Sequence, residues 1–281
     1  MKKIQNIQAL RGAAVLSVVL FHLMIIEKKY GGTKTFLTDI FNFGMFGVDM
    51  FFVISGFVMV VVTRGKFQDT KQAIRFLYHR ASRIYPTYWV YSVLVLVIFL
   101  INPFLINSSQ GNQIDILASF LLLPSETLPL LMVGWTLIHE MYFYLVFFLV
   151  LLVVPEKRFI NAILLWGAVV ICMNVYLELN NPFADLVFHP LTIEFILGCL
   201  IAINLYRKDN QIPKTRPFLA IAFVGLVISI CVYSLYQYST GNIDPEGWWR
   251  ILIFGTPATI IVYCFIYAER NGFVVHSSLI K

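Results

Sequence analysis

Eight stretches of the chain are apolar over about 20 residues, or nearly so, which is the length that an α-helix needs to cross a lipid bilayer. They lie at about residues 8–27, 43–62, 85–102, 129–154, 159–178, 184–206, 217–238 and 249–268. A ninth run, at about 114–123, is too short to span and predicts an interfacial or re-entrant segment. No stretch alternates as the strands of a membrane barrel do. The pattern predicts an all-α fold, a polytopic membrane helix bundle of about eight transmembrane helices, in one domain over residues 1–281.

The composition agrees with a membrane protein, because 59% of the 281 residues are hydrophobic and only 13% are charged. A soluble globule of this size has too little interior to bury so much apolar surface. The same figures exclude disordered, collagen-like, coiled-coil and disulfide-rich secreted chains. The four cysteines are Cys172, Cys199, Cys231 and Cys264. They fall inside apolar stretches without close spacing, as expected of buried apolar residues rather than of disulfides or metal ligands.

Basic residues predict the orientation, because Lys and Arg in short loops stay on the cytoplasmic side of a membrane. With the N-terminus inside, the inner segments hold 17 of the 21 basic residues and the outer segments hold four, Lys28, Lys29, Lys34 and Arg250. We therefore expect both termini in the cytoplasm. The net charge of +6 is interpreted as a consequence of this topology and not as a nucleic-acid-binding surface.

Ionisable residues inside an apolar span are costly, and each is a functional candidate. Arg11 and His22 share one face of the first span, about 16 Å apart along the helix axis. They are either a snorkelling arginine and a hydrogen-bonded histidine of the core, or part of an active site in which the imidazole is a general base. Their spacing alone leaves both interpretations open.

The second span contains a carboxylate among small residues. Asp49 lies just inside its outer end, and Gly47, Ser55 and Gly56 are small enough to let a neighbouring helix approach closely. The small residues need no function beyond packing. Asp49 is either an interfacial carboxylate that reaches water or a functional group.

A basic stretch from Arg75 to Pro86, which includes Arg80 and Arg83, precedes the third span. It predicts a short amphipathic helix on the cytoplasmic face. Lipid head groups are one partner for such a helix. A phosphate-bearing cytoplasmic cofactor is the other, because the planar guanidinium matches phosphate oxygens.

The fourth span contains Trp135, His139, Glu140 and Tyr144. A buried glutamate must be neutral, paired or facing a water-filled cavity. Glu140 and Tyr144 are four residues apart and share a helix face, as do Trp135 and His139. His189 and Glu194 of the sixth span form a weaker group, either structural or lining an acceptor site.

Taken together, these motifs resemble those of the membrane-bound acyltransferase-3 family, which includes bacterial O-antigen and exopolysaccharide O-acetyltransferases. The residues that carry the resemblance are Leu10-Arg11-Gly12 with His22, Gly47-Val48-Asp49-Met50-Phe51-Phe52-Val53-Ile54-Ser55-Gly56-Phe57, Arg80 with Arg83-Ile84-Tyr85-Pro86, and Gly134-Trp135-Thr136-Leu137 with Glu140, Phe143 and Tyr144. The four motifs follow the family's order and spacing. The form of the last one is most similar to the exopolysaccharide-acetylating branch.

The resemblance implies an enzyme of the bacterial inner membrane that moves an acetyl group from acetyl-CoA to a hydroxyl of a cell-envelope or exported polysaccharide. The expected site has the catalytic residues Arg11, His22 and Glu140, the cofactor-binding residues Arg75, Arg80 and Arg83, and the substrate-binding residues Asp49, Ser55, Trp135 and Tyr144. The expected partners are membrane lipids, the glycan acceptor and acetyl-CoA, without metal or nucleic acid.

The sequence departs from the family's pattern at its end. After a segment such as 275–280, family members usually continue into a Leu-Gly-Asp-x-Ser-Tyr-type motif and further helices, whereas this sequence stops at Lys281. The expectation is a C-terminally truncated member of the family, of which the activity is open. Two alternatives also stay open, an inactive fragment and a transporter or flippase of a lipid-linked glycan, although the inverted repeats of many transporters are not found.

Overall fold

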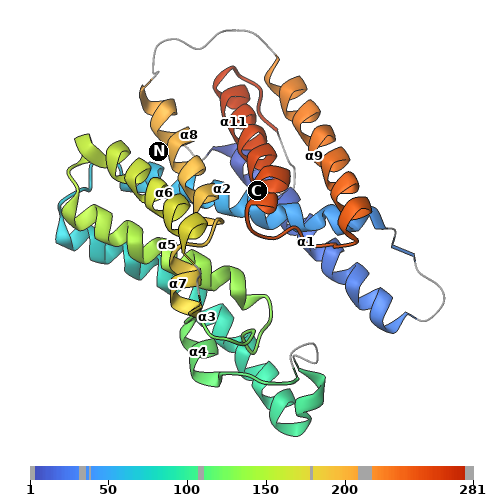
Figure 1. Cartoon of the computed structure of the whole chain (residues 1–281). Helices are drawn as coiled ribbons and strands as arrows, with labels where there is room; N and C mark the ends of the chain where they lie inside the picture. The colour runs from blue at the N-terminus through green and yellow to red at the C-terminus, as the bar shows by residue number, and fades with distance from the viewer. Residues whose placement is uncertain are drawn as a thin grey trace. The chain divides into compact units, whose positions relative to one another are not determined.

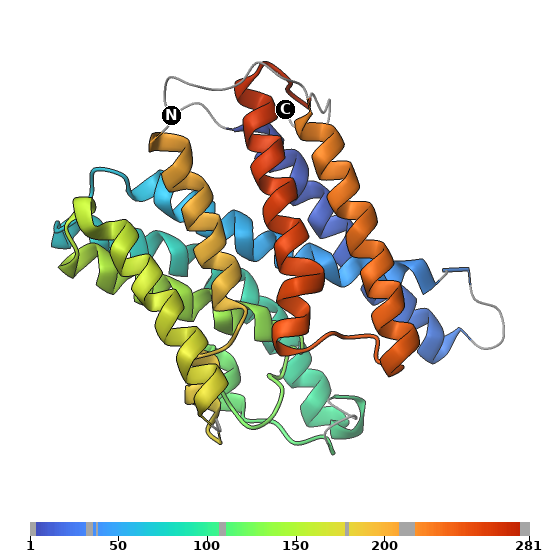
Figure 2. The ribbon, with the colours of Figure 1, turned by 45° about the horizontal axis from the view of Figure 1, so that its top comes forward.

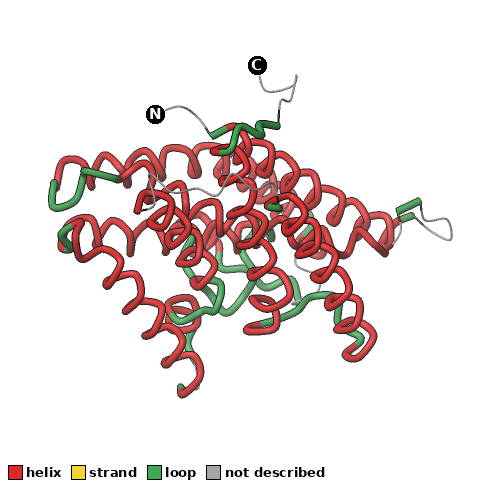
Figure 3. Tube along the Cα trace, turned by 90° about the horizontal axis from the view of Figure 1, so that it is seen from above, coloured by secondary structure: helices red, strands yellow, loops and turns green. Residues whose placement is uncertain are grey.

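The computed structural model describes residues 4–31, 36–37, 39–106, 111–177, 180–207 and 217–275. Within these ranges the chain forms helices joined by loops, and no strand is present (Figure 3). The described part contains eight helical segments that are long and apolar enough to cross a membrane. This confirms the prediction of an all-α polytopic bundle. The segment 276–281, where the sequence departs from the family's pattern, lies outside the described residues.

The elements follow one another along the chain as α1 (Gln5–Tyr30), η1 (Asp39–Met45), α2 (Phe46–Thr63), α3 (Thr70–Ile101), η2 (Pro103–Leu105), α4 (Ile116–Leu121), α5 (Gly134–Val153), η4 (Glu156–Arg158), α6 (Phe159–Tyr176), α7 (Pro182–Val187), α8 (Thr192–Arg207), α9 (Phe218–Thr240), α10 (Gly247–Arg250), the π-helix η5 (Ile251–Gly255) and α11 (Thr256–Arg270) (Figure 1).

The chain divides into two compact units, residues 1–62 with 193–281 and residues 63–192. The first unit holds α1, η1, nearly all of α2 and α8, and α9 to α11. In it, α9 and α11 lie side by side, and α11 also packs against α1 (Figure 2). The second unit holds α3 to α7.

Two glycines bring α1 against the segment that leads into α2. A Cβ atom at Gly44 would lie 2.3 Å from the carbonyl oxygen of Ser17, and one at Gly47 would lie 2.4 Å from that of Ala14. Real Cβ atoms do not approach other atoms so closely, so only glycine permits this contact. The helix that carries Arg11 and His22 therefore packs directly on the backbone of η1 and α2.

The first turn of α1 is fixed by polar groups from the end of the chain. The carboxylate of Glu269 accepts hydrogen bonds from the backbone N–H groups of Gln5 (2.9 Å) and Asn6 (2.7 Å). The fully buried amide of Asn6 donates to the carbonyl oxygens of Phe265 and Phe273. A negative group at a helix N-terminus is favourable because the first N–H groups lack helical partners. Glu269 thus ties α1 to α11.

In the second unit, α3 and the first part of α5 run past each other in opposite directions. The rings of Phe76 and Phe147 have their centroids 5.7 Å apart, and Tyr88, further along α3, lies against Gly134, the first residue of α5. A Cβ atom at Gly134 would lie 3.1 Å from the Tyr88 ring. The basic stretch of α3 therefore packs along α5.

The basic stretch and the third span form one helix of 32 residues, α3, with Pro86 inside it. The sequence had suggested a short surface helix before the span. Proline removes one backbone donor, but its fixed φ is helical, and proline is tolerated in transmembrane helices. The basic segment is thus continuous with the span.

The short apolar run forms α4, which has six residues and is too short to cross a membrane, as predicted. Asp115 caps its start by accepting from the N–H of Ala118 at 2.8 Å. Three α3 side chains donate to consecutive carbonyls at its end, Tyr88 to Ser119 (2.8 Å), Trp89 to Phe120 (2.9 Å) and Tyr85 to Leu121 (2.9 Å). These bonds hold the connection from α4 to α5 against α3.

Candidate functional site

The His22 ring is held by its own helix. Its Nδ1 atom lies 2.8 Å from the carbonyl oxygen of Val18. A carbonyl oxygen can only accept a hydrogen bond, so Nδ1 carries the proton and, in the neutral ring, Nε2 carries the lone pair. The side chain is neither buried nor fully exposed. This is the tautomer that a general base acting through Nε2 requires.

Arg11 lies on the same helix face three turns before His22 and is likewise partly exposed. A separation of about 16 Å along the axis keeps its guanidinium from the atoms that His22 contacts. If both residues predicted to be catalytic in α1 contact one ligand, they would contact different parts of it.

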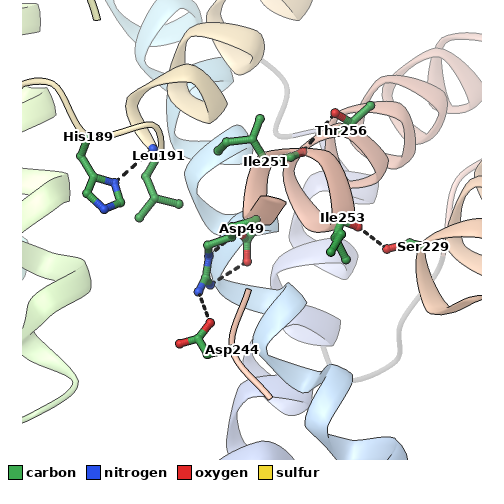
Figure 4. Close-up of polar contacts among 9 residues, drawn as sticks. Asp49, His189, Leu191, Ser229, Asp244, Ile251, Ile253 and Thr256 are labelled. Carbon is green, nitrogen blue, oxygen red and sulfur yellow. Dashed lines mark hydrogen bonds and ion pairs between the residues drawn. The ribbon is translucent and has the colours of Figure 1, made fainter. Parts of the chain in front are cut away.

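Asp49 is fully buried and forms an ion pair that the sequence analysis did not identify. Its Oδ1 accepts from Arg250 Nε at 2.8 Å and its Oδ2 accepts from Arg250 Nη2 at 2.9 Å. Arg250 is 5% exposed, and its Nη1 also donates to Asp244 at 3.0 Å (Figure 4). Partial burial raises the pKa of Asp244, while Arg250 opposes that shift. The bidentate pair gives Asp49 a structural role, and its role in substrate binding stays a prediction.

Glu194 is a second buried carboxyl of the first unit, with no exposed surface. It lies against Gly255, where an added Cβ atom would come within 2.6 Å of its Oε1. Gly255 ends the π-helix η5, which directly follows Arg250. Such π-turns occur often at functional sites. The buried carboxyls of Asp49 and Glu194 and the guanidinium of Arg250 thus lie at the start of the last span.

Arg80, Glu140 and Tyr144 come together in the second unit, as the four-residue spacing of the last two suggested. The Arg80 guanidinium lies 5.9 Å from the centre of the Tyr144 ring and 5.7 Å from that of Phe76. The Tyr144 hydroxyl donates a hydrogen bond to the Glu140 carboxylate. A cation is attracted to the face of an aromatic ring, which holds the guanidinium in place. Tyr144 thus links the acidic and the basic residue.

Arg75 and Arg83 are exposed on α3. Arg75 Nε lies 3.3 Å from Nε2 of His79, one turn further on, and Arg83 follows one turn after that. The spacing places the three on one helix face. This face presents two guanidinium groups to whatever lies outside the helix.

A cavity of about 560 Å³ lies between the first turns of α5, the loop before it and the segment around α7. Trp135 and His139 line it from α5, and His189 lines it from the residues that follow α7. The rings of His139 and His189 meet edge to face, with their centroids 4.7 Å apart. Of the four residues named for substrate binding, Trp135 alone lines this cavity, together with His189, which was expected to be structural or to line an acceptor site.

The two histidines hold opposite tautomers. His139 Nδ1 lies 3.0 Å from the carbonyl oxygen of Trp135 and so carries its proton there. His189 Nδ1 instead accepts from the backbone N–H of Leu191 at 3.2 Å, so its proton is on Nε2. The Nε2 atom of His139 is buried, and the contact of the two rings joins α5 to the residues that follow α7.

The predicted site residues fall in both units. The first unit holds Arg11, His22, Asp49 and the partly exposed Ser55, and the second holds Arg75, Arg80, Arg83, Trp135, Glu140 and Tyr144. Sequence reasoning missed Arg250, although one signal was present, since it is a basic residue at the edge of an apolar stretch. The acidic residues of the cavity, Glu126 and Asp185, lie in loops or short helices and gave no signal.

Comparison with known proteins gives a consistent result. A family model described as an acyltransferase domain matches residues 4–280. The chain is 33% identical to the exopolysaccharide production protein ExoZ of Rhizobium meliloti, over 85% of this chain and 72% of that protein. It is 24% identical to a Staphylococcus aureus (strain COL) protein provisionally named an O-acetyltransferase, over 90% of this chain and 44% of that protein. No solved structure matches the chain significantly.

Proposed function

The chain belongs to the acyltransferase family whose model covers nearly all of it, and on this premise we propose that it moves an acetyl group from acetyl-CoA to a hydroxyl of an exported or cell-envelope polysaccharide. The names of the relatives, an exopolysaccharide production protein and O-acetyltransferases, support a polysaccharide acceptor. The eight apolar helices support action at a membrane, which we propose is the bacterial inner membrane, with the N-terminus in the cytoplasm.

The hydrogen bond between His22 Nδ1 and Val18 carries the proposal, because it leaves Nε2 ready to accept a proton. In the proposed step the sugar hydroxyl oxygen bonds to the acetyl carbonyl carbon as Nε2 takes the hydroxyl proton. The carbon–sulfur bond then breaks, and the leaving thiolate takes that proton from the imidazolium to become the thiol, which returns His22 to its neutral form. Histidine suits this role because it titrates near neutral pH.

Binding of the donor is assigned to the basic residues. An arginine stays protonated and cannot serve as a base, so Arg11 is proposed to hold an anionic part of the donor. Arg75, Arg80 and Arg83 are proposed to meet its phosphates, since guanidinium groups match phosphate oxygens. Glu140 and Tyr144 then orient Arg80, which supports a positioning role for Glu140, and its catalytic role stays a prediction.

The experiment compares three proteins in membranes supplied with radiolabelled acetyl-CoA and the host's glycan. In His22→Ala both ring nitrogens are lost. In His22→Asn a side-chain donor remains near Val18, but no basic nitrogen does. We expect both variants to lose transfer by a factor of about 10² to 10⁴, the usual contribution of a general base.

Transfer by His22→Asn at the rate of the unchanged protein would reduce His22 to a structural role. Retention of transfer by both variants would exclude it as the base. Equal amounts of each protein in the membrane, measured by immunoblotting, make the comparison valid.

A further inference from the structure

The cavity of the second unit differs in charge from the basic face of α3. None of the described residues that line it is Lys or Arg, whereas the exposed carboxylates of Glu126 and Asp185 both contribute to its wall. Like charges in a site are unfavourable. The lining therefore disfavours phosphates and carboxylates, including those of a nucleotide donor.

Its polar groups suit hydroxyl groups. A hydroxyl both donates and accepts a hydrogen bond, so it suits a wall that holds groups of both kinds. The carboxylates of Glu126 and Asp185 accept hydrogen bonds. Asn181 already accepts from the N–H of Phe183 at 2.8 Å through its carbonyl oxygen, which leaves its NH₂ group as a donor.

Trp135 gives the cavity an apolar wall. Its ring is partly exposed and lies edge to face with His139, centroids 5.8 Å apart. A pocket with one aromatic surface and several convergent polar groups is typical of small-molecule sites, and a volume of about 560 Å³ is within their range. The C–H faces of a sugar ring match such a surface, while its hydroxyls match the polar groups.

The cavity lies at one end of α5. Trp135 and His139 belong to its first two turns, while its other end leads into Glu156–Arg158 with the basic residues Lys157 and Arg158. By the positive-inside rule, that basic end is cytoplasmic and the cavity end faces outward. An exported glycan would be met on that side.

We propose that this cavity is the acceptor subsite of the enzyme and that it holds an uncharged sugar residue of the polysaccharide, stacked on Trp135 and hydrogen-bonded by Asn181 and the carboxylates. This inference rests on the proposed function, since it takes the acceptor to be a glycan. It adds that the bound residue carries no acidic group.

Binding to oligosaccharides, measured without a donor, tests the subsite. The full chain in lipid nanodiscs is titrated by calorimetry with neutral tetrasaccharides of glucose, galactose, mannose and N-acetylglucosamine, and with tetragalacturonate as the anionic counterpart. We expect at least one neutral probe to bind, and Trp135→Ala or Asp185→Asn to weaken its binding by about tenfold, the value of one lost stacking or charge-assisted contact. Trp249→Ala and Glu246→Gln, exposed and outside the cavity, are the matched controls and should change binding less than threefold or so.

A further variant tests whether the cavity prefers uncharged sugars to anionic ones. Asp185→Lys should strengthen the binding of tetragalacturonate by a larger factor than the one by which it weakens the binding of the neutral probe. The proposal of a sugar subsite is overturned if no neutral probe binds. It is also overturned if the Trp135→Ala variant binds a neutral probe as tightly as the unchanged protein does.

The experiments distinguish a failure of the proposed function from a failure of the proposed subsite. If neutral probes bind as expected but no label passes from acetyl-CoA to glycan, the transfer reaction is wrong and the cavity stays a sugar site. If transfer proceeds in Trp135→Ala with an unchanged KM for glycan, the reaction stands and the subsite is wrong. Acetyl-CoA binding by each variant checks that it is folded.

Discussion

Gly56 of α2 and Gly198 of α8 each face the backbone of the other helix. A Cβ atom at Gly56 would lie 2.0 Å from the carbonyl oxygen of Phe195, and one at Gly198 would lie 2.0 Å from that of Val53. Between them, the thiol of Cys199 donates to the carbonyl of Gly56 at 3.4 Å. Small residues allow this close approach in membranes, where van der Waals contact is a main source of helix association.

Gly56→Ala is expected to destabilise the protein, because the obstructing atoms belong to the backbone of α8 and cannot rotate away. Overpacking of this kind costs about 1–3 kcal/mol, and more where the backbone must move. The melting temperature in detergent measures the effect. Gly12→Ala is the control, since nothing lies within 4 Å of an added Cβ there. A stability of Gly56→Ala equal to that of Gly12→Ala would show that the crossing can open.

Loss of the buried arginine should be more costly still. Arg250→Gln leaves the Asp49 carboxylate without its charge partner, and removal of one member of a buried pair costs about 3–5 kcal/mol. Chemical denaturation in mixed micelles gives the free energy of unfolding. The control is Asp39→Asn, which breaks the exposed pair with Lys28 and should cost at most about 1 kcal/mol.

The double variant Asp49→Asn with Arg250→Gln removes both charges, and should recover part of the loss. If Arg250→Gln is no less stable than Asp39→Asn, the pair contributes nothing to the fold.

Arg80→Lys should raise the KM for acetyl-CoA by about tenfold with a smaller change in kcat, because the ammonium keeps the charge but not the planar fork. Release of free thiol, followed over a range of donor concentrations, separates the two constants. Lys71→Ala, an exposed cation on the same helix, is the control and should leave both constants near their original values. A fall in kcat with an unchanged KM would remove Arg80 from donor binding.

The expected orientation is tested with single cysteines in a variant that lacks the four native ones. Gln113→Cys, exposed between α3 and α4, should react with a membrane-impermeant maleimide added to intact cells. Lys157→Cys, exposed between α5 and α6, should react only after the cells are permeabilised. The reverse pattern would place the N-terminus outside.

The sequence predicted the fold well because a bilayer imposes length and apolarity on every span. The first span was expected at 8–27, and the helix α1 is longer, over Gln5–Tyr30. The prediction used apolarity, and it therefore left out the polar residues at the helix ends. The continuity of the basic stretch with the third span was not predicted, because a proline such as Pro86 often marks a helix boundary, although transmembrane helices also tolerate it.

The site was only partly predictable. The contact of Glu140 with Tyr144 follows from helix geometry, because residues four apart share a face. Asp49 and Arg250 are 201 residues apart in the sequence, so local spacing carries no information on their pairing. The tautomers of His139 and His189 depend on backbone carbonyl and N–H positions that only the folded chain provides.

The three donors from Tyr85, Tyr88 and Trp89 have a consequence for where α4 can end. The last carbonyls of a helix lack partners and normally require water, which the hydrocarbon of a bilayer does not supply. Here the aromatic side chains of α3 take the place of that water. Leu117 and Leu121 of α4 are 69% and 45% exposed, as suits contact with lipid tails. The chain can therefore turn back at the end of α4 with these three carbonyl groups paired, even where no water reaches them.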